Sequence, residues 1–83
     1  MLNYNKMAEE IMELFETKKQ NDSTLTYDYF VKYKYNSWMD ENQKEYLLKS
    51  ISNITNQKGM EIIPTKISQL KTYTIVVYFD TKF

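Results

Sequence analysis

The segment KTYTIVVYFD, residues 71–80, decides the fold of this chain. It is rich in β-branched and aromatic residues, which favour extended strands, and its side chains alternate with a period of two. One face would carry Tyr73, Ile75, Val77 and Phe79, and the other would carry Thr74, Val76 and Tyr78. Because both faces are largely apolar, we expect a central strand of a sheet or a strand whose second face meets a partner.

The segment just before it predicts another strand, over residues 61–67, with residues 68–70 as the turn between the two. Pro64 indicates that this strand lies at an edge or carries a bulge, because proline cannot donate a ladder hydrogen bond.

Residues 40–57 predict a helix whose apolar stripe consists of Leu47, Leu48, Ile51 and Ile54. Ser37 or Asp40 can cap its start, and Gln43 gives the segment after Asp40 the pattern of a capping box. Gly59 is a typical stop signal.

The first half of the chain predicts a second helix over residues 4–19, capped by Asn3 or Asn5 and followed by a polar loop at 20–23. Its apolar face would carry Tyr4, Met7, Ala8, Ile11, Leu14 and Phe15. Residues 24–35 alternate with a period of two and predict a strand, although a helix also fits the segment loosely.

The expected order is α-β-α-β-β. It corresponds to an α+β fold in a single small domain, residues 1–83, with two helices on one face of a mostly antiparallel three-stranded sheet.

Composition narrows the chemistry available to the chain. It carries 11 lysines and 11 acidic residues, with no Arg, His or Cys and a single Gly. Disulfides, thiolate nucleophiles, His-based catalysis and a glycine-rich phosphate loop are therefore excluded. We expect a protein that is not an enzyme and that has no cofactor and no metal.

The longest apolar run, residues 75–79, is far shorter than the roughly 20 residues of a membrane span. The first residues lack the apolar stretch of a secretory signal. We expect no membrane association and a cytoplasmic location.

Tyrosine is the most distinctive residue type. Tyr27, Tyr29, Tyr33 and Tyr35 share one face of the expected strand, and Trp38 follows just beyond. These rings could fill the core, form a protein interface or stack on bases. Stacking on bases needs cations alongside the rings, whereas Lys32 and Lys34 alternate onto the opposite face.

Charge is distributed unevenly along the chain. Glu9, Glu13 and Glu16 form an acidic ridge on the first helix, which is a solvated face, a protein-contact surface or a local mimic of phosphate charge. Near the C-terminus, Lys58, Lys66, Lys71 and Lys82 form a weak basic patch or protect edge strands from aggregation.

Because His and Cys are absent, we expect this protein to act through contacts of its surface and not through reactive side chains. Lysine without arginine, together with abundant Asn, Ile and Tyr, is typical of AT-rich genomes. We therefore expect a phage or mobile-element protein that binds a host protein and blocks it sterically, as anti-defence or anti-CRISPR inhibitors do. The ridge Glu9, Glu13 and Glu16, the tyrosines and Trp38 are the candidate contact residues. The alternatives are a small nucleic-acid-binding regulator and a homodimeric scaffold whose last strand pairs across a two-fold axis.

Overall fold

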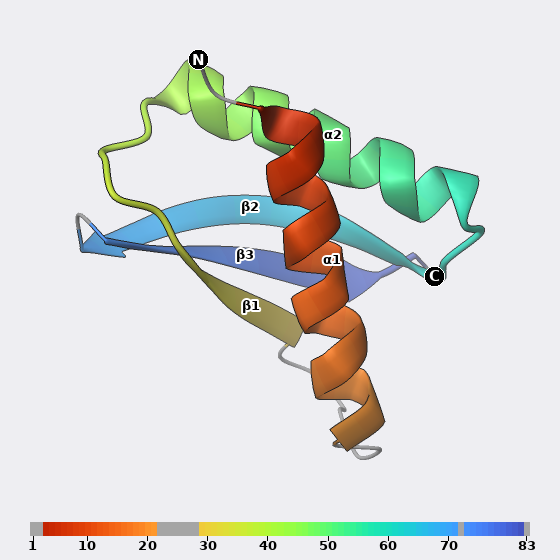
Figure 1. Ribbon diagram of the computed structural model, residues 1–83. Helices are drawn as coiled ribbons and strands as arrows, with labels where there is room; N and C mark the ends of the chain where they lie inside the picture. The colour runs from red at the N-terminus through yellow and green to blue at the C-terminus, as the bar shows by residue number, and fades with distance from the viewer. Residues whose placement is uncertain (1–2, 22–28, 72, 83) are drawn as a thin grey trace.

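The computed structural model describes residues 3–21, 29–71 and 73–82. Its elements follow in the order α1 (Tyr4–Asn21), β1 (Tyr29–Lys34), α2 (Glu41–Gln57), β2 (Ile62–Lys71) and β3 (Thr74–Thr81). The three strands form one antiparallel sheet, and both helices pack on the same face of it (Figure 1). The predicted α+β fold is confirmed.

β3 is the central strand, because the sheet order is β1-β3-β2. On one side Phe30 of β1 lies opposite Tyr78, and on the other side Lys66 of β2 lies opposite the same residue. The prediction of a central strand is therefore confirmed. Because β3 is paired along both edges, it cannot pair with a second copy across a two-fold axis, and that form of homodimer is excluded.

The turn between the last two strands was placed wrongly. Residues 68–70 belong to β2, where Ser68 and Gln69 lie opposite Val76 and Ile75, and Lys71 ends β2 instead of starting β3. Two of the predictions about this strand are confirmed: β2 is an edge strand, and it carries a bulge between Pro64 and Lys66.

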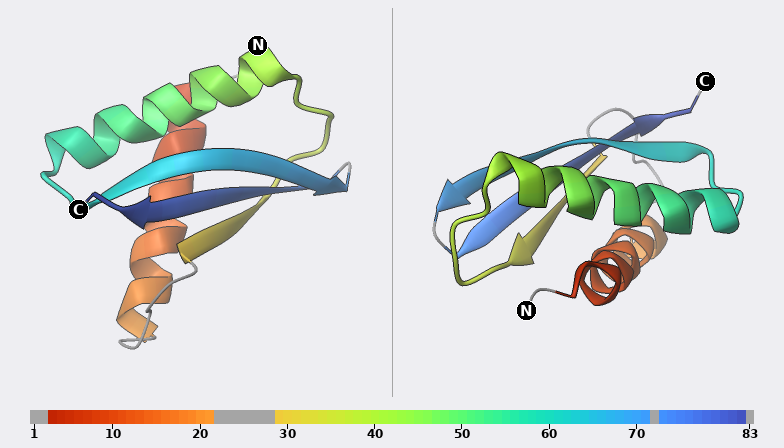
Figure 2. Two further views of the ribbon diagram at one scale, coloured as in Figure 1. Left: turned by 180° about the vertical axis from the view of Figure 1, so that it is seen from behind. Right: turned by 90° about the horizontal axis from the view of Figure 1, so that it is seen from above.

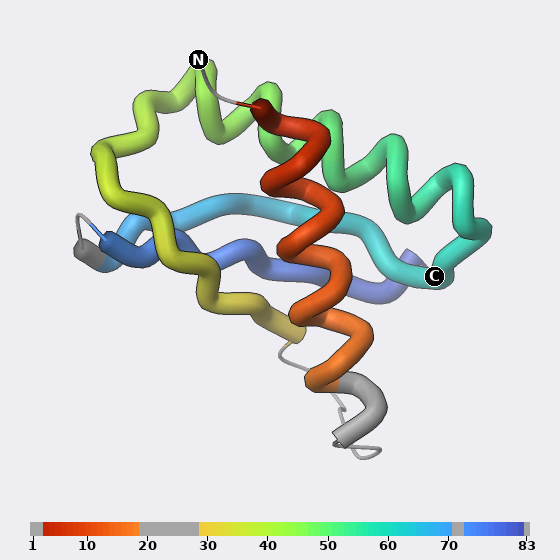
Figure 3. Tube along the Cα trace, in the orientation of Figure 1, coloured from red at the N-terminus to blue at the C-terminus, as the bar shows by residue number. Residues whose placement is uncertain are grey.

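α1 begins at the predicted residue, with the Asn3 side-chain oxygen accepting the Lys6 backbone N–H at 3.0 Å. It extends two residues beyond the predicted end, so residues 20 and 21 are helical. Met12 is buried in the core, whereas Leu14, which was expected there, is exposed. The helix crosses the strands of the sheet (Figure 3), and Met7, Ile11 and Phe15 of its predicted apolar face are buried as expected.

α2 follows its prediction closely. Asp40 is the N-cap, and its carboxylate accepts the Gln43 backbone N–H at 2.8 Å while the Gln43 side chain accepts the Asp40 N–H at 2.9 Å. The predicted stop is confirmed at Gly59, whose φ of 63° lies in the left-handed region that glycine adopts without strain.

β1 confirms the strand prediction for residues 29–34 and excludes the helical alternative there, whereas Tyr35 follows the strand. The remainder of that prediction, residues 24–28, lies outside the described residues.

The core is formed between the helices and the inner face of the sheet, where the Phe15 ring lies 4.9 Å from that of Phe79 and 5.9 Å from that of Tyr29. Of the two helices described, neither is long and apolar enough to cross a membrane.

Candidate functional site

The face of the sheet opposite the helices is the candidate site. Ile75, Val77 and Phe79 of β3 point into the core, so the alternate residues Val76 and Tyr78 point to the other side. Seen from behind, the strands lie in front of α1, and neither of the described helices passes in front of them (Figure 2, left). We call this surface the outer sheet face. Among the described residues it comprises Phe30, Lys32, Lys34, Ile63, Lys66, Ser68, Leu70, Thr74, Val76, Tyr78 and Asp80.

The centre of the outer sheet face is apolar and hollowed. A hollow of about 420 Å³ is lined by Phe30, Lys32, Leu70, Val76 and Tyr78. Val76 is only 2% exposed although it lies outside the main core, whereas Leu70 is 59% exposed. A second hollow, of about 340 Å³, adjoins it across Phe30 and extends to Leu14 and Lys18 of α1.

Lysines surround this centre and contact its rings. The Lys18 ammonium reaches from α1 over the Phe30 ring, 3.6 Å from the centroid, and donates a 2.8 Å hydrogen bond to the Phe30 carbonyl oxygen. The Lys66 ammonium lies 5.0 Å from the centroid of Tyr78. The Phe30 and Tyr78 rings are themselves 6.4 Å apart. Lys32 and Lys34 are exposed beside them on β1.

Two of the tyrosines considered for an interface, Tyr29 and Tyr33, lie on the inner face of β1, and Tyr35 follows the strand. Tyr29, Tyr33 and Tyr35 are partly buried against the core, which accounts for much of their ring surface. Tyr27 lies outside the described residues. Trp38 does not join them, because it is 63% exposed in the connection between β1 and α2.

The acidic ridge lies on the helix layer, away from the outer sheet face. Glu9 and Glu13 are exposed on α1, and Glu16 forms an ion pair with Lys58 at 3.2 Å. Of the lysines expected to form a basic patch or to protect edge strands, Lys58 contacts α1 whereas Lys66 lies on the edge strand β2 over Tyr78, so these two do not share one surface. Lys82 is exposed beyond the end of β3. Lys71 ends β2, and its side chain is not among those that the structure describes.

Tyr33 and Tyr35 are perturbed by their surroundings. Burial raises the pKa of Tyr33, and the negative charge and hydrogen bond of Glu10 raise it further; the Tyr33 hydroxyl donates to the Glu10 carboxylate at 3.2 Å. Burial also raises the pKa of Tyr35, with smaller contributions from Tyr4 and Asp40. Both effects favour the neutral phenol, so neither residue is an activated base or nucleophile.

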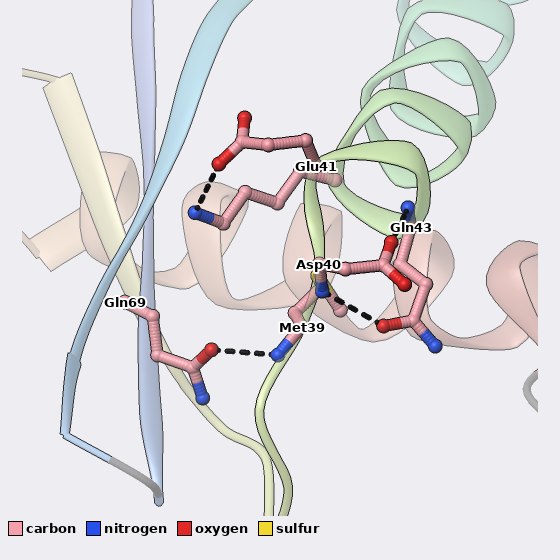
Figure 4. A network of polar contacts seen from close by, with 6 residues as sticks. Met39, Asp40, Glu41, Gln43 and Gln69 are labelled. Atoms are coloured by element: carbon pink, nitrogen blue, oxygen red, sulfur yellow. Dashed lines mark hydrogen bonds and ion pairs between the residues drawn. The ribbon is translucent and has the colours of Figure 1, made fainter.

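A polar network fixes the connection that carries Trp38. The Gln69 side chain accepts the Met39 backbone N–H at 2.7 Å, beside the cap of α2 (Figure 4). It also donates to the Ser37 carbonyl oxygen at 2.6 Å. Met39 is buried, so Trp38 is held at the surface between two anchored neighbours. Tyr73, 65% exposed, lies at the same end of the molecule, where its carbonyl accepts the Tyr35 N–H.

No group of three His, Cys, Asp or Glu side chains that could hold a metal ion occurs among the described residues. The arrangement offers an apolar, lysine-rimmed surface, which is suited to binding.

The residues of the outer sheet face were not among the predicted contact residues. Two signals pointed to them: the apolar second face of residues 71–80, and the alternation of Phe30 with Lys32 and Lys34. Neither signal says which face the helices cover.

Comparisons with protein-family models, curated proteins and solved structures find no match to this chain.

Proposed function

We propose that this protein is a non-catalytic protein-binding module that sterically blocks a host factor, and that the outer sheet face is its contact surface. The observation that carries the proposal is the apolar centre of this face, which neither of the described helices covers and which includes the exposed Leu70. An apolar centre surrounded by charged groups is the usual anatomy of a protein interface.

The composition supports the origin and location that we propose. An arginine-free, AT-rich chain of this size suits a phage or mobile-element product acting in the cytoplasm of a low-GC bacterium. Trp38 and Tyr73 add exposed aromatic surface at one end of the sheet. Aromatic side chains of this kind are enriched among the residues that dominate binding energy.

The experiment compares two exposed apolar residues on opposite sides of the molecule. Leu70, 59% exposed, lines the outer sheet face, and Tyr46, 57% exposed, lies on α2. Tagged wild type, Leu70→Ser and Tyr46→Ser are used as bait in lysate of a low-GC bacterium, with quantitative mass spectrometry. We expect one protein to be retained by wild type and Tyr46→Ser and to be depleted with Leu70→Ser.

The retained protein should then co-elute with wild type in size-exclusion chromatography at a fixed stoichiometry. The proposal fails if no protein is retained specifically, or if Leu70→Ser retains it as well as wild type does.

A nucleic-acid-binding regulator is the second candidate. The observation favouring it is that Lys32, Lys34 and Lys66 share a face with the rings of Phe30 and Tyr78, since single-strand binders combine cations with aromatic rings. Its signature would be binding to a single-stranded oligonucleotide that weakens steeply with salt.

A further inference from the structure

We infer that the outer sheet face binds an acidic segment of the partner protein, with a large apolar side chain of that segment seated in the hollow over Val76. The inference rests on the proposed function and specifies the chemistry of the partner.

The first argument is the charge of the outer sheet face. On or beside it stand Lys18, Lys32, Lys34 and Lys66, and Asp80 is the one acid among the residues that define this face. The helix layer is closer to balance, because its acids stand among Lys6, Lys44, Lys49 and Lys58. A chain without net charge thus presents a basic surface, which attracts and orients an acidic one.

The second argument is the shape of the apolar centre. The hollow of about 420 Å³ has Val76 at 2% exposure and is lined by Phe30, Leu70 and Tyr78. A seated apolar side chain would cover the exposed part of Leu70. The surrounding ammonium groups would meet carboxylates that flank this side chain in the partner.

The third argument separates an acidic peptide from a nucleic acid strand. Bases stack on free ring faces. Here the Lys18 ammonium lies 3.6 Å from the Phe30 centroid, and the Tyr78 ring is tilted by 43° from that of Phe30. A base would have to displace Lys18, whereas a carboxylate can bind its ammonium in place. Arginine, the best side chain for bidentate contacts to phosphates and base edges, is absent.

The fourth argument concerns the edge of the sheet. A partner strand could extend the sheet only at a free edge. Along β1 the Phe30 carbonyl oxygen already accepts a hydrogen bond from Lys18, and β2 is interrupted by Pro64 and bulges. We therefore assign the binding to side chains on the face and not to strand addition.

The test is an NMR titration of ¹⁵N-labelled protein with the peptide acetyl-Asp-Glu-Asp-Phe-Glu-Asp-Glu-amide. Two control peptides replace its Phe by Ser, or its acidic residues by Lys. We expect saturable shifts at the amides of Lys32, Val76 and Tyr78 with the first peptide. Binding should weaken as salt rises and be lost or strongly reduced with both control peptides.

Two charge-reversed variants provide the matched comparison. Lys32→Glu/Lys66→Glu should weaken binding by about tenfold or more, since two cations beside the hollow become repulsive. Lys6→Glu/Lys49→Glu changes the net charge equally on exposed helix positions and should change the Kd by no more than about twofold.

Three results would overturn the inference. One is the absence of shifts on the outer sheet face at millimolar peptide and low salt. Another is tighter binding of oligothymidylate than of the peptide at equal salt, which would make nucleic acid the occupant. The third is self-association in light scattering that Lys32→Glu/Lys66→Glu abolishes, which would make the acidic helix of a second copy the occupant.

The inference and the proposed function can fail separately. If the peptide does not bind but lysate capture still depends on Leu70, only the acidic chemistry of the partner is wrong. If the peptide binds but no protein is captured, the proposed function fails.

Discussion

Tyr33 links the sheet to α1 through its hydrogen bond to Glu10, and this bond makes stability depend on pH. Burial, followed by the charge and the hydrogen bond of Glu10, raises the pKa of Tyr33 above its ordinary value of 10.0. A group whose pKa is higher in the folded state stabilises the fold below its unfolded pKa, and this contribution is lost as pH rises through the folded value. We expect the free energy of unfolding of wild type to fall more steeply than that of Tyr33→Phe above about pH 10.

Urea unfolding across pH 7 to 11 measures this difference. Glu10→Gln serves as the control, because it keeps an acceptor for the phenol and removes the charge, so its slope should lie between the other two. Parallel curves for wild type and Tyr33→Phe would contradict the assignment.

For single residues, the sequence predicted correctly which side chains of β1 share a face of the sheet. It did not predict which of the two faces packs against the helices. The alternation of residues 29–34 placed Tyr29 and Tyr33 on one face and Lys32 on the other, as the structure has them. Alternation does not say which face a helix will cover. The sequence therefore left the tyrosines between core filling and an interface, and Tyr29, Tyr33 and Tyr35 pack against the core. Phe30 was not named as a contact residue.

Among the elements, Gln69 determines how the β1–α2 connection sits on β2. Its side chain satisfies the Met39 N–H and the Ser37 carbonyl together. We expect Gln69→Ala to leave the part-buried Met39 N–H without its partner, at a cost of about 1–3 kcal/mol. Hydrogen exchange at the Met39 amide should become faster, because the connection would open more readily.

Gln69→Glu is the matched control for this element. It retains an oxygen for the Met39 N–H, but its second carboxylate oxygen faces and repels the Ser37 carbonyl oxygen, so the exchange rate at Met39 should lie between those of wild type and Gln69→Ala. Equal exchange rates at Met39 in wild type and Gln69→Ala would show that the bond does not hold the connection.

The same residue explains the misplaced turn. Residues 68–70 separate two apolar runs and were predicted as a turn for that reason. In the structure Gln69 lies opposite Ile75 on the inner face, where its amide is satisfied by the backbone of residues 37 and 39. A polar residue can occupy a strand when a distant segment supplies its partners, and these partners lie about thirty residues away. The helix ends of α2, by contrast, depend on local signals such as Asp40 and Gly59 and were predicted correctly.

For the whole molecule, a net charge of zero does not show where the lysines lie on the folded surface. The sequence indicated an acidic first helix and a mildly basic C-terminal segment. The structure instead brings Lys32 of β1 and Lys66 of β2 onto one face, because both strands flank β3 and the two lysines lie opposite its outward-facing residues Val76 and Tyr78. This arrangement depends on strand order, which short-range patterns do not contain.

The basic outer sheet face predicts chromatographic behaviour that the net charge does not. An ion-exchange resin senses charges within about a Debye length, roughly 10 Å at 0.1 M salt, so it responds to a local patch. We expect wild type to be retained on a cation exchanger at pH 7 although its formal net charge is zero. Lys32→Glu/Lys66→Glu should elute at clearly lower salt than Lys6→Glu/Lys49→Glu, although both pairs change the net charge equally. Circular dichroism would verify that both variants are folded. Elution of the two variants at the same salt would mean that the lysines of the outer sheet face do not act together, and would remove the electrostatic basis for an acidic partner.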